Sequence, residues 1–182
     1  PESILADQAL MTLGKSLAEN GEHDQAVSTY KLVLELKNPI SAAEAQFRIG
    51  VALEAKAKEI AQAQEGAANS KWSEKGSTLT PLQRLMGNAI FAYRATFQRY
   101  PESSYATEAL GRVVRHYVET ENFSLAATLL ENVFTEYPDA SFLDEMLMHW
   151  FKVAYRMGDK ATAKAKLDQL IFDYPTSPYV SE

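Results

Sequence analysis

The chain has 182 residues, 46% of them hydrophobic, with a formal net charge of −6 and no cysteine. The negative charge argues against nucleic acid or an anionic membrane surface as the main partner, and the lack of cysteine excludes disulfides and thiolate metal sites. No apolar run approaches the roughly 20 residues of a membrane span, so we expect no direct membrane insertion of this chain.

Near the N-terminus, residues 3–38 are predicted to form a first pair of helices, in a chain rich in the good helix formers Ala, Leu, Glu, Gln and Lys. The opening sequence PESILADQA resembles, from its proline onward, a Tyr-Pro motif that recurs further along the chain. The last residues lie inside another copy of the motif. We therefore expect this chain to be a fragment of a longer array.

The second pair of helices, residues 41–100, is longer than the others and contains an insertion near residues 56–80. Ser41 and Glu44 have the spacing of a capping box, which predicts that a helix starts there. The helix continues through EAKAKEIAQAQEGAA, so we expect it to extend about two to three turns beyond its neighbours, at 3.6 residues per turn.

The polar stretch NSKWSEKGST predicts a loop after this long helix. Thr80, Pro81 and Gln83 then predict the start of the next helix, with a cap, a proline in the first turn and a reciprocal glutamine. Trp72 lies in the loop. We favour the interpretation that it folds back over the overhanging helix, and the alternative is an exposed anchor for a partner.

A Tyr-Pro motif then marks the ends of helices at a constant spacing of 37 residues. The prolines of this motif are Pro101, Pro138 and Pro175. Apolar residues at helical spacing fill the intervals and predict helix pairs in residues 104–137 and 141–174, with a further helix starting in residues 177–182. A fixed period of this length is typical of solenoid arrays.

The placement of small and aromatic residues in these pairs resembles the tetratricopeptide repeat family. The resemblance rests on Leu10, Gly14, Gly21, Ala26 and Tyr30 in the first pair, Gly50, Ala89, Tyr93 and Pro101 in the second, Leu110, Tyr117, Ala126 and Pro138 in the third, and Leu147, Gly158, Ala163 and Pro175 in the fourth. It implies an all-α fold, a right-handed superhelical array of about four antiparallel helix pairs. Val114 and Phe151 depart from the family, which prefers small residues at these positions.

The 37-residue spacing and the form of the Tyr-Pro motif resemble one subgroup of this family, found in bacterial envelope proteins. These are the lipoprotein that helps to assemble outer-membrane barrels and the periplasmic coordinator of the Tol-Pal system. The resemblance implies a periplasmic or cell-envelope location, and a cytoplasmic location is the alternative.

The residues that carry chemistry in other proteins are sparse in this chain. The candidates are the histidines His23, His116 and His149 and the recurring glutamates Glu108, Glu145 and Glu182. The histidines lack paired-ligand spacing, and each glutamate belongs to a different repeat, where it favours the positive end of its helix. We therefore expect no metal, no cofactor and no catalysis, with a shared site of His116 and His149 as the alternative.

The resemblance implies a concave face lined by the first helix of each pair. The groove-facing positions that it implies include Lys15, Ala18, Glu19, Val51 and Ala55. The residues expected to contact a partner are Phe47, Val51, Arg115, Met148, Lys152 and Tyr155, with Trp72 as the alternative contact.

These features predict a non-catalytic scaffold that binds a peptide or protein segment in the groove. Two alternatives stay open. The array is either an architectural spacer or self-assembly module that makes contact through residues 56–80, or the positioning domain of an enzyme whose catalytic part lies outside this sequence.

Overall fold

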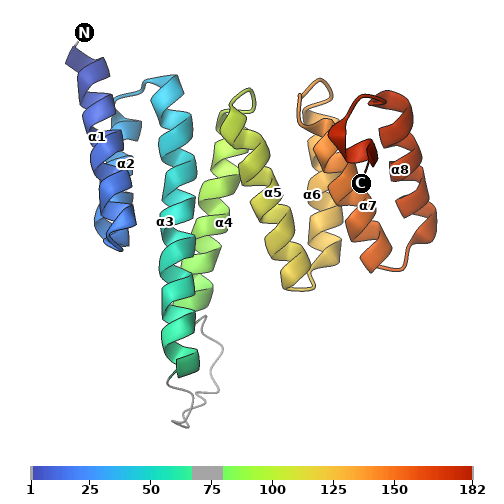
Figure 1. The fold of residues 1–182 in the computed structure, drawn as a ribbon, viewed down its shortest axis with the longest axis horizontal. Helices are drawn as coiled ribbons and strands as arrows, with labels where there is room; N and C mark the ends of the chain where they lie inside the picture. Colours follow the sequence, from blue (N-terminus) through green and yellow to red (C-terminus); the bar gives the residue numbers. More distant parts are fainter. Residues whose placement is uncertain (1, 67–79, 182) are drawn as a thin grey trace. The chain divides into compact units, whose positions relative to one another are not determined.

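The computed structural model describes residues 2–66 and 80–181 (Figure 1). Every regular element within these ranges is helical, which confirms the predicted all-α class of paired helices. The helices are α1 (Glu2–Glu19), α2 (His23–Glu35), α3 (Pro39–Gly66), α4 (Pro81–Arg99), α5 (Ser104–Glu119), α6 (Phe123–Glu136), α7 (Leu143–Arg156) and α8 (Lys160–Asp173), followed by the 3₁₀ helix η1 (Pro178–Ser181). The chain divides into two compact units, one up to Tyr105 and one from Ala106 onward.

Tight turns join the two helices of three pairs. After α1, Gly21 has φ of 79°, and the next amide, that of Glu22, donates to the Leu17 carbonyl at 2.8 Å. After α7, Gly158 has φ of 78°. Glycine suits both positions because it has no Cβ to oppose a left-handed backbone. Glu121 takes the same conformation after α5, with φ of 59°, although it carries a side chain.

In the first unit each helix packs on the next, α1 on α2, α2 on α3 and α3 on α4 (Figure 1). Two glycines allow the close approach. A Cβ placed on Gly14 would lie 2.5 Å from Cε1 of Tyr30, and a Cβ on Gly50 would lie 2.5 Å from Cε1 of Tyr93. Both tyrosines are 1% exposed. The repeated combination of a glycine with a tyrosine is therefore a packing requirement of the first two helix pairs.

The start of α3 differs from the prediction. The expected capping box of Ser41 and Glu44 is wrong, because the helix already begins at Pro39. Proline suits the first turn, where its missing N–H costs nothing. Asn38 precedes it, and its side-chain oxygen accepts a hydrogen bond from the amide of Ile40 at 3.2 Å.

The insertion has the predicted long helix. α3 has 28 residues against 18 in α1, and it extends beyond α1 and α2 (Figure 1). The predicted capping box at the start of α4 is confirmed: the Thr80 hydroxyl accepts from the Gln83 amide at 3.1 Å, and the Thr80 amide donates to the Gln83 side chain at 2.9 Å. Trp72 and the predicted loop around it lie outside the described residues.

In the second unit α6 packs on α7 and α7 on α8. Its core contains Leu147 and Leu170, both fully buried. The expected further helix is a 3₁₀ turn instead, in which the Val180 amide donates to the Ser177 carbonyl. The Ser177 hydroxyl fixes this turn, because it donates to Asp144 at 2.7 Å.

Candidate functional site

The second unit brings three polar side chains of α5 and α7 together. Arg115 and Lys152 are exposed, and both act electrostatically on His149. His149 and Lys152 lie three residues apart on α7, the spacing that places side chains on one helix face. Two of the predicted contact residues, Arg115 and Lys152, thus surround a histidine that is only 24% exposed.

This environment lowers the pKa of His149 below its ordinary value of 6.5. The main cause is burial, which disfavours the charged imidazolium. The positive charges of Lys152 and Arg115 act in the same direction. The opposing charge of Glu145, whose Oε1 lies 3.7 Å from the His149 Nε2, is too weak to reverse the shift. At neutral pH the imidazole is therefore uncharged.

The lowered pKa of His149 predicts a pH dependence of stability. The unfolded chain binds a proton near pH 6.5, and the folded chain binds it only at lower pH, so protonation favours unfolding. Lowering the pH from about 7.5 to about 5.5 should therefore cost the wild type more stability than the variant His149→Gln. Urea denaturation at both pH values measures this difference, and an equal loss in both proteins would contradict the assignment.

Tyr155 and Met148 have different surroundings on α7. Tyr155 is 64% exposed, and its ring centroid lies 6.1 Å from that of Phe151. Met148 is 5% exposed and packs in the core with Leu147 and Leu170. Of the contact residues predicted in the second unit, Arg115, Lys152 and Tyr155 are accessible, whereas Met148 is a core residue.

The contact residues predicted in the first unit, Phe47 and Val51, also differ in their exposure to solvent. Phe47 is 3% exposed, and its ring lies 5.6 Å from that of Tyr93 and 5.4 Å from that of Tyr105. It is a core residue, so the accessible contact surface is narrower than the sequence predicted. Val51, one turn further along α3, is half-buried and lines a cavity.

This cavity, of about 270 Å³, lies among α1, α2 and α3. Four groove-facing positions expected on α1 and α3 line it together with Val51. They are Lys15, Ala18, Glu19 and Ala55. Tyr30 also lines the cavity, although its position in the repeat pattern indicated only a packing role. Gly14 packs against the Tyr30 ring and sets its position, but this contact does not determine the hydrogen-bond partner of the Tyr30 hydroxyl.

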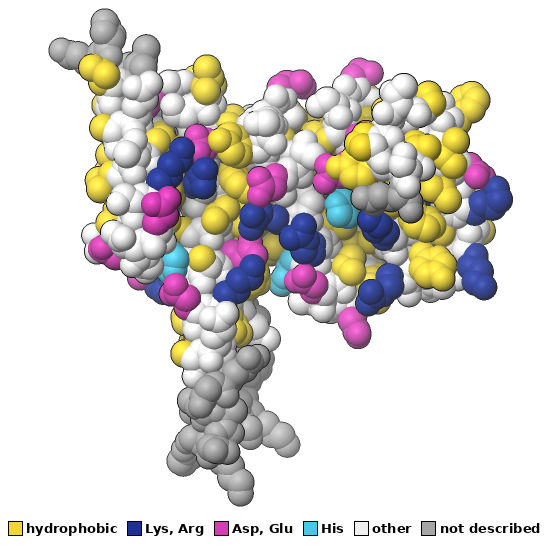
Figure 2. All heavy atoms as spheres, in the orientation of Figure 1, with side chains coloured by type: hydrophobic (Ala, Val, Ile, Leu, Met, Phe, Trp, Pro, Cys, Tyr) yellow, Lys and Arg dark blue, Asp and Glu magenta, His cyan; other side chains and the backbone are white. Residues whose placement is uncertain are grey.

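One side of the cavity carries a network of ion pairs. Lys15 Nζ lies 2.9 Å from Glu44 Oε1, and Arg48 Nε lies 3.1 Å from the same oxygen. Burial opposes ionisation of Glu44, but the hydrogen bonds and charges of the two cations outweigh it and lower the pKa of the carboxyl. Glu44 therefore stays charged at neutral pH. Figure 2 shows both signs of charge next to hydrophobic side chains on the face that it views.

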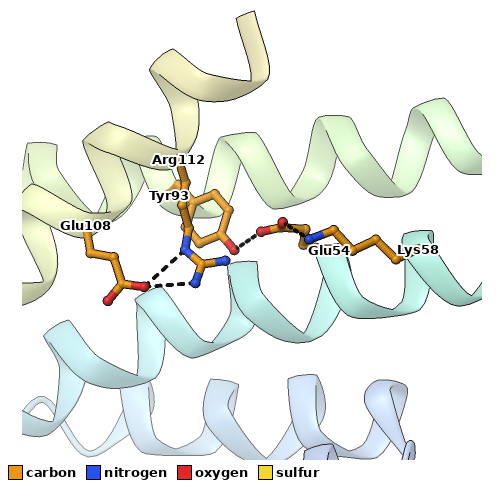
Figure 3. A network of polar contacts seen from close by, with 5 residues as sticks. All are labelled: Glu54, Lys58, Tyr93, Glu108 and Arg112. Atoms are coloured by element: carbon orange, nitrogen blue, oxygen red, sulfur yellow. Dashed lines mark hydrogen bonds and ion pairs between the residues drawn. The ribbon is translucent and has the colours of Figure 1, made fainter. Parts of the chain in front are cut away.

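A second network joins α3 and α4. The Tyr93 hydroxyl donates to Glu54 at 2.6 Å, and Lys58 Nζ lies 2.7 Å from the same carboxylate (Figure 3). In the second unit, Glu108 pairs with Arg112 at 2.8 Å, on the same helix. Two of the three recurring glutamates, Glu108 and Glu145, thus have cationic or histidine neighbours of their own helix, and the third, Glu182, lies outside the described residues.

Over residues 2–66 and 80–181, no group of three or more histidine, aspartate or glutamate side chains could hold a metal ion. In the same part of the chain, no helix has the combination of length and apolar character that crossing a membrane requires.

Residues 8–36 and 152–177 match the family model of the tetratricopeptide repeat. The first stretch contains most of α1 and all of α2, and the second contains the end of α7 and all of α8. These matches support the family resemblance at two separate places in the chain. No curated protein matches the sequence.

Proposed function

We propose that this chain is a non-catalytic scaffold that binds a peptide or protein segment on the first helices of its pairs. The two tetratricopeptide repeat matches support this proposal, since such repeats generally mediate contacts between proteins. The observation that carries it is the exposure of Arg115, Lys152 and Tyr155 on α5 and α7 of the second unit.

The chemistry of this cluster suits a segment that carries an apolar and an acidic side chain. Tyrosine and arginine are the residue types that most often dominate binding energy once desolvated. Tyr155 follows the buried residues Val153 and Ala154, so the helix that carries it is held in place before a partner arrives. The positive charges of Arg115 and Lys152 favour a carboxylate on the bound segment.

The binding surface can be tested with selected peptides in place of a natural partner. Peptides are selected from a displayed random library against the whole chain, and their affinities are measured by fluorescence anisotropy. We expect Tyr155→Ala and Arg115→Ala each to weaken binding by about tenfold or more. The control Phe172→Ala removes an aromatic side chain that is 85% exposed on α8, and it should leave the affinity unchanged.

Deletion of residues 60–79 tests the rival contact through the insertion. If this deletion abolished binding while Tyr155→Ala and Arg115→Ala had no effect, the insertion would be the binding element. If none of these changes mattered, the selected peptides would bind elsewhere and the proposed contact surface would be wrong; failure to select any peptide would favour an architectural spacer.

The location in the bacterial envelope is a further part of the proposal. Its support is the constant 37-residue spacing of the Tyr-Pro motif, which resembles the envelope subgroup of the family. Fractionation of the cells that naturally produce the protein would test it, and recovery in the cytoplasmic fraction would refute it.

A further inference from the structure

The turn that joins α1 to α2 contains the pair Asn20-Gly21, and backbone hydrogen bonds hold it closed. The amide of Gly21 donates to the carbonyl of Ala18 at 3.1 Å. The next amide, that of Glu22, donates to the carbonyl of Leu17 at 2.8 Å. The amide nitrogen of Gly21 therefore faces back into α1 as long as the turn stays closed.

The side chain of Asn20 is not held in this turn. Asn20 is exposed, and its carboxamide makes no hydrogen bond in the part of the chain that the structure describes. Two other asparagines differ in this respect. The carboxamide of Asn38 donates to Asp7 at 2.6 Å, and that of Asn122 donates to Thr120 at 2.8 Å. Water and the neighbouring backbone can therefore both reach the Asn20 carboxamide.

An asparagine that precedes a glycine can lose its amide group with water as the only reagent. The glycine nitrogen attacks Cγ of the asparagine and forms a C–N bond. The carboxamide nitrogen leaves as ammonia, together with the proton that the glycine nitrogen gives up. Water then opens the resulting five-membered succinimide ring at one of its two carbonyl groups. The product is an aspartate, or an isoaspartate in which the backbone runs through the former side chain.

Asn20 differs from the other described asparagines in the residue that follows it. Glycine has no Cβ, so nothing on it hinders the approach of its nitrogen to Cγ. The other successors carry a side chain, and proline also has no N–H. They are Pro39 after Asn38, Ala89 after Asn88, Phe123 after Asn122 and Val133 after Asn132. Among these asparagines the succinimide should therefore form fastest at Asn20.

We propose that Asn20 is a site of spontaneous deamidation, at which the chain gains a carboxylate with time and loosens the turn between α1 and α2. The reaction follows the opening of the turn, because the Gly21 nitrogen must leave the Ala18 carbonyl before it can face Cγ of Asn20. Helix ends open more easily than the rest of a fold. The site belongs to the first unit and does not rest on the proposed function.

Both products of the reaction weaken the turn. An aspartate at position 20 lies at the C-terminal end of α1, where the helix dipole disfavours an anion. Glu19 and Glu22 beside it are also anionic. An isoaspartate adds a methylene group to the backbone, so the amide of Glu22 no longer lies opposite the carbonyl of Leu17.

The turn also lies next to α3. A Cβ placed on Gly21 would lie 3.9 Å from Oε1 of Glu59. The same oxygen lies 2.9 Å from Nε2 of His23, the first residue of α2. A change in the turn therefore also affects the contact between the start of α2 and α3.

The deamidation is tested on the whole chain, kept at neutral pH in water enriched in heavy oxygen. Mass spectrometry of its proteolytic peptides follows each asparagine, since label enters when water opens the ring. We expect Asn20 to gain label about tenfold faster than the exposed residues Asn88 and Asn132. The variant Asn20→Gln should gain none at this position. Equal rates at Asn20 and Asn132 would overturn the proposal.

A capped peptide of residues 16–25 tests whether the turn must open. The isolated peptide lacks the closed turn, so its asparagine should react about tenfold faster than Asn20 of the whole chain. Equal rates would contradict the opening step.

Hydrogen exchange tests whether the product loosens the turn. The amide of Glu22 should exchange about tenfold faster in the aged chain than in the fresh chain. The control is the amide of Ala126, which donates to the Asn122 carbonyl at 3.1 Å at the start of α6 and should not change. Unchanged exchange at Glu22 in a chain that has lost the Asn20 carboxamide would refute the loosening.

The variant Asn20→Asp supplies one product without ageing. Its melting temperature should lie about 1–3 °C below that of Asn20→Gln, because only the aspartate places a charge at the end of α1. Thermal denaturation followed by circular dichroism measures both variants. Equal melting temperatures would contradict the effect of the new carboxylate on the turn.

Discussion

The variant Gly50→Ala is expected to unfold with a free energy about 2 kcal/mol below that of the wild type. The added Cβ would lie 2.5 Å from Cε1 and 2.7 Å from Cδ1 of Tyr93, far inside van der Waals contact. The ring cannot move aside easily, because Tyr93 is 1% exposed and its hydroxyl is bonded to Glu54. Alanine gains about 1 kcal/mol in helix propensity, which offsets part of the cost of the clash.

Gly87→Ala is the matched control. It also lies inside a helix, α4, but a Cβ on Gly87 would meet no atom within 4 Å. Only the gain in helix propensity remains, so this variant should be more stable than the wild type by about 0.5–1 kcal/mol. Urea denaturation followed by circular dichroism measures both variants. Equal effects of the two substitutions would show that the contact between Gly50 and Tyr93 does not constrain the packing of α3 on α4.

Leu147→Ala is expected to cost about 3 kcal/mol in the second unit, the largest effect that we predict. Leu147 is fully buried on α7, in a core cluster with Leu170. Truncation removes apolar contacts and leaves a space that the surrounding helices fill only in part, and both effects destabilise the folded state. Because α7 also carries Lys152 and Tyr155, this core residue holds the proposed contact surface in place.

The control for this variant is Leu125→Ala on α6, where the leucine is 54% exposed. It removes the same atoms from a position that remains largely in water, so its effect should stay below about 0.5 kcal/mol. Fluorescence of Trp150, recorded with Trp72 replaced by phenylalanine, reports on the second unit during urea denaturation. Similar losses for the two leucine variants would mean that Leu147 is not part of a packed core.

Local signals in the sequence were enough to specify the fold class and most of the helix boundaries. Apolar spacing specified the helices, and glycine and proline specified where they stop, since both act on the local backbone. The capping box of Thr80 and Gln83 is also a local interaction, and it was predicted correctly. The predicted start of α3 was wrong because two local signals competed. The helix begins after Asn38, at Pro39, and not at Ser41.

The candidate site depended on the tertiary structure. The family pattern places Phe47, Met148 and Tyr155 on comparable helices, yet the first two are buried and the third is exposed. The exposure of a helical residue depends on which neighbouring side chains cover it, and those come from distant parts of the chain.

Tyr30 and Tyr93 also show which features the sequence determined and which ones only the tertiary structure decided. The family resemblance placed a glycine and a tyrosine in each of the first two pairs, and the structure shows that the two residues of each pair are in contact. Whether the hydroxyl finds an acceptor depended on the packing: Glu54 accepts from Tyr93, whereas the Tyr30 hydroxyl has no hydrogen-bond partner among the described residues. A hydrogen bond needs two groups within about 3 Å, and only the folded chain sets that distance.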